Sequence, residues 1–281
     1  MNEDSIQAPM SDTSPASKAT FAISPRKAGI FLGIVAIIMS TLAIIGDLLE
    51  LKLDSGRDGS SALWLWPFAR QFNFVEEGNL ANFYQGTQLV LAAVILLIIW
   101  RGKKQAAGAF RGHWLALGLI FVFLGCDEVA QIHETTIANT VSLLRHRLTG
   151  HDPDGKTEWL FLYLPLLAVF GLSYISFLKH LPGRIAVLMM VSGCIYVGGA
   201  VGVEKFVNWF AEKYGDDTVS YVLIDNLGEF MESTGIALFI YTLLSYLALQ
   251  AGEISFRFPK DEGNAKHSAL AGREQVRHQH R

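Results

Sequence analysis

The sequence has few charged residues, few cysteines and no surplus of basic residues. Only 17% of its 281 residues are charged and 51% are hydrophobic, which excludes a disordered chain. Its two cysteines both lie within apolar runs, so no disulfide framework is indicated. A formal net charge of −3 provides no general basic surface and argues against a nucleic-acid-binding protein.

Long hydrophobic runs dominate the chain instead. The apolar residues fall in blocks of about 20, the length that crosses a bilayer as an α-helix. We therefore predict an all-α polytopic membrane protein, a bundle of six transmembrane helices. The predicted spans are residues 28–49, 80–100, 114–133, 159–178, 185–204 and 221–249.

Polar segments flank and connect these spans. We predict a disordered cytosolic tail over residues 1–27, a six-helix transmembrane domain over 28–250 and a polar cytosolic tail over 251–281. The segment 63–74 is rich in Trp and Phe, which is typical of a stretch lying along the membrane surface. If the N-terminus lies in the cytoplasm, most of the 23 Lys and Arg residues lie in cytoplasmic segments. The positive-inside rule therefore predicts both termini in the cytoplasm.

The acidic residues gather near the opposite, outer face of the predicted bundle. Five of the six spans bring carboxylates to the outer quarter of the membrane, and none carries one in its cytosolic half. A charged carboxylate in hydrocarbon costs about 2.5–3.5 kcal/mol. Such residues must be neutral, paired or bound to a cation, so their accumulation indicates a cation site.

The third span ends in the segment CDEVAQIHE, which carries the most informative polar pattern. On a regular helix, Asp127, Gln131 and Glu134 share one stripe, because offsets of four and seven return to nearly the same face. Glu128 and His133 then lie on the two flanks, from which they can reach neighbouring helices.

The last two spans provide further carboxylates. In the sixth, Asp225, Glu229 and Glu232 form a stripe by the same spacing. The fifth ends in GGAVGVE, whose glycines Gly198, Gly199 and Gly202 predict a close helix approach that brings Glu204 near its partners. We therefore predict metal ligands at Asp127, Glu134, Glu204, Glu229, Glu232 and Glu77, and proton-transferring catalytic residues at Glu128 and His133.

Many carboxylates with a single imidazole favour a hard or borderline cation. Iron, manganese or calcium suits this donor set better than zinc. Simpler interpretations stay open: Glu77 and Asp225 suit the N-terminal dipole of a helix, Asp47 can mark the end of the first span, and Asp127 with Glu128 can belong to a buried hydrogen-bond network.

The motifs DEVAQIHE, GGAVGVE and NLGEFMESTG resemble a group of bacterial multipass membrane proteins. These carry an acidic pair followed by His-Glu in one helix and a Glu-x-x-Glu motif in the last, and they have no settled activity. The resemblance covers residues 28–249 and implies the bacterial inner membrane. The sequence is also weakly similar to alkaline ceramidase-like membrane hydrolases, but it lacks their several histidines.

Three functions follow from this pattern. The first is an inner-membrane protein with a metal site near the periplasmic face, acting as an enzyme on a lipid or another membrane-dissolved substrate. The second is a proton- or cation-coupled transporter, which titrating intramembrane carboxylates suit. The third is a non-catalytic scaffold whose acids only hold helices together. Membrane lipids are the predicted partners, and nucleic acids are not.

Overall fold

The computed structural model describes residues 20–55, 67, 71–72, 79–105, 108–150, 159–251 and 255–257. The chain forms two compact units. The smaller unit, Met1–Ile23 with Glu253–Arg281, contains strands β1 (Thr20–Ala22) and β2 (Ser255–Arg257), which pair antiparallel. Most of both predicted tails and of the surface segment 63–74 lies outside the described residues.

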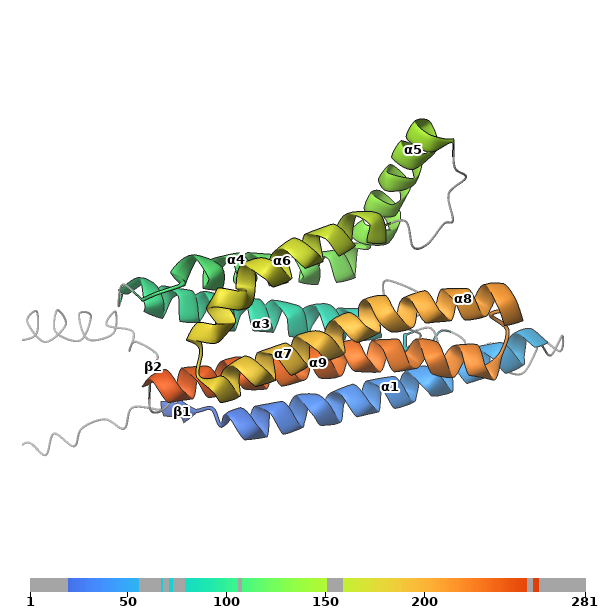
Figure 1. Cartoon of the computed structure of the whole chain (residues 1–281). Helices are drawn as coiled ribbons and strands as arrows, with labels where there is room; N and C mark the ends of the chain where they lie inside the picture. The colour runs from blue at the N-terminus through green and yellow to red at the C-terminus, as the bar shows by residue number, and fades with distance from the viewer. Residues whose placement is uncertain are drawn as a thin grey trace, which may run out of the picture. The chain divides into compact units, whose positions relative to one another are not determined.

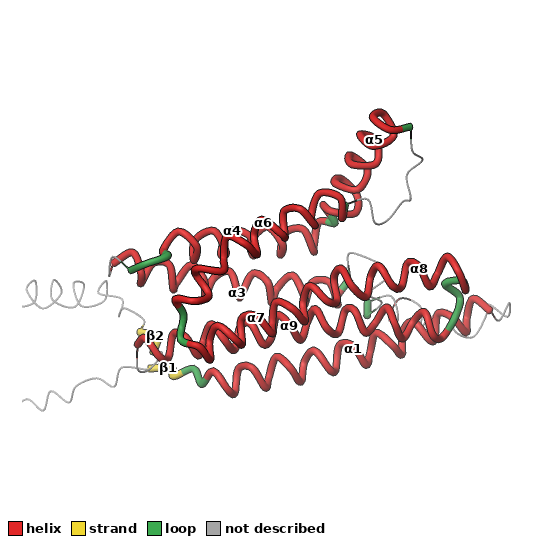
Figure 2. Tube along the Cα trace, in the orientation of Figure 1, coloured by secondary structure: helices red, strands yellow, loops and turns green. Residues whose placement is uncertain are grey.

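The larger unit, Ser24–Gly252, consists of helices joined by short turns over its described length (Figure 1). Its elements are α1 (Pro25–Ser55), α3 (Leu80–Gln105), α4 (Arg111–Ala130), η1 (Ile132–Ile137), α5 (Ala138–Thr149), α6 (Leu160–His180), α7 (Gly183–Val197), η2 (Gly198–Val203), α8 (Glu204–Tyr214) and α9 (Val219–Ala251). The η elements are π-helical. The elements α7, η2 and α8 follow one another without a loop (Figure 2).

Six helices in the described part of the chain are long and apolar enough to cross a membrane. They are α1, α3, α4, α6, the continuous run α7–η2–α8, and α9. Each coincides with one predicted span, so the prediction of six transmembrane helices is confirmed. The chain is an all-α polytopic membrane protein.

Helix α9 is the centre of the helical unit. It packs along α1, α3 and α7, and it also contacts η2 and α8, while α4 packs mainly on α3. Figure 1 shows α9 running between α1 and α7. Its buried side chains include Ile236, Ile240 and Leu243, each at most 2% exposed, whereas α6 turns Val169 and Leu172 outward. An apolar outer surface of this kind suits contact with lipid tails.

Several polar side chains are buried along α9 and the helices packed on it. Gln85, Gln88, Asn226, Ser233 and Thr242 are each at most 2% exposed. A membrane interior offers no water to such groups, so they must find partners within the protein. The partners of Gln85 and Asn226 lead to the acidic residues.

Candidate functional site

The C-terminal end of α4 is built around the buried carboxylate of Asp127. The α-helix ends at Ala130 because Gln131 adopts a left-handed conformation with φ 55°, and the π-helical turn η1 follows. This turn places His133 next to Asp127 in the last turn of α4. Its backbone N–H donates to Asp127 Oδ1 over 2.7 Å, and its Nδ1 lies 3.2 Å from the same oxygen.

Two aromatic residues at the start of α6 complete this arrangement. The hydroxyl of Tyr163 donates to Asp127 Oδ2 over 3.3 Å. The Trp159 ring meets His133 and Tyr163 edge-on, with centroids 5.3 and 5.1 Å apart. Asp127 thereby holds an imidazole with one oxygen and a phenol with the other, a set that can accept and pass protons.

The predicted stripe of Asp127, Gln131 and Glu134 is wrong as a helical face. It assumed an α-helix through His133, but the left-handed backbone at Gln131 and the π-helical turn that follows it interrupt the α-helical register. His133 lies against Asp127 of its own segment and also meets Trp159 at the start of α6, so its predicted reach to a neighbouring helix is retained. The side chain of Glu134 lies outside the described part of the structure, as does Glu77.

Glu232 occupies a polar position between α9 and α3. Its Oε2 accepts a hydrogen bond of 3.0 Å from Gln85 Nε2, and Gln85 Oε1 accepts one of 3.1 Å from Ser233 Oγ. Gln85 and Ser233 are each 1% exposed. The Gln85 amide is therefore fixed by one neighbour and presents its donor to the carboxylate.

Carboxylates from other helices act electrostatically on the same position. Glu232 experiences repulsion from Glu229 and Asp225 on α9, from Glu128 on α4 and from Glu204 at the start of α8. The hydroxyl of Tyr196 on α7 interacts with Glu232, Glu128, Asp127 and Glu229. We use the term acidic region for five of these residues: Asp127, Glu128, Glu204, Glu229 and Glu232.

Glycines allow α7 and η2 to approach α9 beside Glu232. A Cβ on Gly199 would lie 2.5 Å from the Gly228 carbonyl oxygen and 2.9 Å from Glu232 Cγ. A Cβ on Gly198 would come within 3.1 Å of Met231 Cε, whereas nothing lies within 4 Å of one on Gly202. The predicted close approach therefore depends on Gly199, and to a lesser extent on Gly198, but not on Gly202.

A separate buried pair joins α1 to α9. Asn226 Nδ2 donates to Asp47 Oδ2 over 2.6 Å, and these residues are 1% and 5% exposed. The Oδ1 atoms of both residues have no hydrogen-bond partner among the described residues. Asp47 is thus part of the bundle interior, although its position in the sequence suggested the end of a span.

No group of three or more described His, Cys, Asp or Glu residues is arranged to hold a metal ion. The structure thus joins Asp127 with His133 by direct contact, and it relates Glu128, Glu204, Glu229 and Glu232 through electrostatic interaction. The contributions of Tyr163, Trp159 and Tyr196 escaped prediction because isolated aromatic residues in apolar runs carry no pattern. Metal binding stays a prediction.

Comparison with known proteins gives one match. A family model described as a domain of unknown function (DUF8692) matches residues 30–247, which span all six membrane helices. No curated protein and no solved structure matches the chain.

Proposed function

We propose that this chain, which belongs to the family described as a domain of unknown function (DUF8692), is a membrane protein that binds and exchanges a cation in its acidic region. The observation that carries the proposal is the electrostatic interaction of carboxylates from α4, α8 and α9 at Glu232. Carboxylates that repel one another within a six-span bundle must be protonated, paired or bound to a cation.

Glu232 is the residue where that requirement is strongest. Its hydrogen-bond donor, Gln85, is neutral, and the charged side chains that act on it are acidic. In the described part of the chain, no Lys or Arg pairs with Glu232. A carboxylate in these surroundings must take up a proton or a metal ion, and either event makes it an exchange site.

The Asp127–His133 pair supports proton exchange in particular. An imidazole within hydrogen-bond distance of a carboxylate accepts and releases protons readily. Glu128, next to Asp127 in the chain, interacts electrostatically with Glu232. A proton taken up at His133 would therefore have acceptors between the end of α4 and the interior of α9, as proton- or cation-coupled transport requires.

The backbone supports a functional rather than a purely structural role. The π-helical segment η1 contains His133 and η2 directly precedes Glu204, and π-helical turns occur frequently at functional sites. Gln131 adds a left-handed non-glycine residue between Asp127 and His133. Strained backbone conformations persist where the surrounding packing holds them in place, and they cluster at functional sites.

A metal-dependent enzyme is the second candidate, favoured by the contacts of Asp127 with both His133 and Tyr163. A bound iron, manganese or calcium ion would supply Lewis-acid chemistry, and a lipid or other membrane-dissolved molecule would be the substrate. The described side chains do not form a ready coordination sphere. We therefore place cation exchange first.

One experiment tests both candidates on the full-length protein. Purified protein in proteoliposomes is assayed for proton flux driven by a pH gradient, and the detergent-purified protein is analysed for bound iron, manganese and calcium. We expect Glu232→Gln to abolish the flux or the metal content, because the amide keeps the Gln85 hydrogen bond but cannot carry a cation. The matched control is Asp216→Asn, which changes an exposed acid in the α8–α9 connection.

The outcomes separate the alternatives. Flux without metal identifies exchange of protons, and bound metal without flux, lost in Glu232→Gln, favours the enzyme candidate. If the wild-type protein shows neither flux nor metal, or if Glu232→Gln equals the wild type in both assays, the acids only hold helices together and the proposal is wrong.

A further inference from the structure

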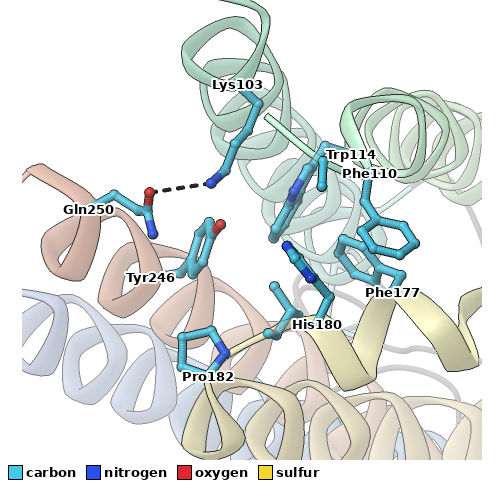
Figure 3. A pocket seen from close by; sticks show the side chains of 10 residues that line it. Lys103, Phe110, Trp114, Phe177, His180, Pro182, Tyr246 and Gln250 are labelled. Carbon is cyan, nitrogen blue, oxygen red and sulfur yellow. Dashed lines mark hydrogen bonds between the residues drawn. The ribbon is translucent and has the colours of Figure 1, made fainter. Parts of the chain in front are cut away.

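A cavity of about 320 Å³ lies at the opposite end of the helical unit from the acidic region. Its walls come from the end of α3, the start of α4, the α6–α7 connection and the end of α9. Figure 3 shows Lys103 and Gln250 entering from one side and Trp114, Phe177 and His180 from the other. None of the described residues that line it is acidic.

Rigid aromatic rings form one wall of this cavity. Trp114 stacks on Tyr246 with ring centroids 5.0 Å apart, and Phe177 meets Trp114 edge-on at 4.9 Å. Trp114 and Phe177 are each 1% exposed, so their rings are held by packing. Such a wall is preformed and suits the apolar part of an amphipathic ligand.

The polar side chains that line the cavity carry hydrogen-bond donors and no negative charge. Lys103 Nζ lies 3.3 Å from Gln250 Oε1 and 5.5 Å from the Tyr246 ring centroid. Among the described residues no carboxylate forms an ion pair with Lys103. His180 contacts the Phe110 ring at 5.1 Å. An ammonium group and an imidazole thus border a cavity whose described lining carries no acidic side chain.

Phe110 places its ring in this wall from a strained backbone conformation. Phe110 has φ 57°, a left-handed conformation that non-glycine residues rarely adopt. Its ring contacts His113, Phe177 and His180. The chain therefore keeps a bulky ring where glycine would be easier to accommodate, which is consistent with a ring that serves the cavity.

We infer that this cavity binds the phosphate of an anionic phospholipid headgroup. Lys103 supplies positive charge, His180 supplies an imidazole, Gln250 supplies an amide, and the aromatic wall receives the glycerol portion. Arg111 and Arg184 lie at the same helix ends and raise the local positive potential. Basic pockets between membrane helices are a known setting for anionic headgroups. The inference does not depend on the function proposed for the acidic region.

The test is a calorimetric titration of the full-length protein in detergent. The probes are dioctanoyl phosphatidylglycerol, dioctanoyl phosphatidylcholine and inorganic phosphate. We expect saturable binding of the anionic lipid and at least tenfold weaker binding of the zwitterionic lipid, whose choline is repelled by Lys103. Inorganic phosphate binding as tightly as phosphatidylglycerol would assign the site to the free ion instead of a lipid, and would overturn the lipid assignment.

Two variants and one control make the test specific. Lys103→Gln should weaken phosphatidylglycerol binding about tenfold, and His180→Asn should weaken it to a smaller extent. Arg101→Gln removes an equal charge from an exposed position on the same helix and should leave binding unchanged. The inference is overturned if neither anion binds, or if Arg101→Gln reduces binding as much as Lys103→Gln does.

Discussion

The two ends of α4 show how one helix can connect chemically opposite regions. The helix begins after Phe110 and ends before Gln131, and these are the non-glycine residues with positive φ in the described part of the chain. At the first end, aromatic rings surround Lys103 and His180. At the second, Asp127 contacts His133, and Glu128 interacts electrostatically with Glu232 of α9. At both ends a non-glycine residue adopts a left-handed backbone conformation next to side chains of a proposed site.

The two ends are closed by different forces. Stacked rings close the basic end, and these contacts are insensitive to the charge of the surrounding groups. Hydrogen bonds between helices and the close approach at Gly199 hold the acidic end. Substitutions should therefore destabilise the acidic end through packing and lost acceptors, while charge removal at the basic end should affect binding alone.

The largest expected effect is that of Gly199→Ala. The added methyl group meets the Gly228 carbonyl oxygen, so η2 and α9 must separate. We expect the free energy of unfolding to fall by about 1–3 kcal/mol, as for other overpacked interiors. Thermal unfolding in detergent measures this loss.

Gly202→Ala is the control for that substitution. It lies in the same π-helical segment, and its new methyl group meets nothing within 4 Å. Equal melting temperatures for the two variants would show that the close contact at Gly199 is unimportant.

A smaller loss is expected when the acceptor at the end of α4 is removed. Asp127→Ala leaves the His133 backbone N–H and the Tyr163 hydroxyl without the oxygens that they bond. An orphaned buried donor costs about 1–3 kcal/mol, and partial exposure of both groups places the loss at the lower limit. Denaturant titration measures the change in the free energy of unfolding.

Asp127→Asn serves as the matched variant, because its side-chain oxygen still accepts one hydrogen bond. It should retain most of the stability that Asp127→Ala loses. A loss as large as that of alanine would mean that the negative charge, and not the acceptor, stabilises this turn.

The smallest expected effect has the opposite sign. Gln131→Gly relieves the left-handed conformation at φ 55°, so the free energy of unfolding should rise by about 0.5–1 kcal/mol. The same denaturant titration detects this gain. A decrease would show that the Gln131 side chain contributes more than its backbone strain costs.

The spans could be predicted from the sequence, whereas the geometry of the acidic region could not. Blocks of about 20 apolar residues specify membrane helices because bilayer thickness fixes their length. The hydrogen bond from Gln85 to Glu232 joins residues 147 positions apart, and no local spacing encodes it. The turn after Ala130 escaped prediction because Gln131 is not a residue that usually marks a helix end.

The fifth span illustrates the same limit. Its apolar length through residue 204 was evident, but its continuation through α8 to Tyr214 was not, since α8 is amphipathic instead of uniformly apolar. Glycines in GGAVGV indicated close packing correctly at Gly199. Spacing alone could not show that Gly202 faces away from any neighbour.

The π-helical segment η2 also makes the chain sensitive to insertions and deletions between α7 and α8. A π-helical turn holds one residue more than the α-helical turn that it replaces, so it behaves as a single-residue insertion. Deleting one residue from Gly198–Val203 would restore α-helical winding and rotate α8 by about 100° about its axis. Glu204 would then point away from α9 with its identity unchanged. Alignments of related chains should therefore tolerate substitutions in this stretch more readily than gaps.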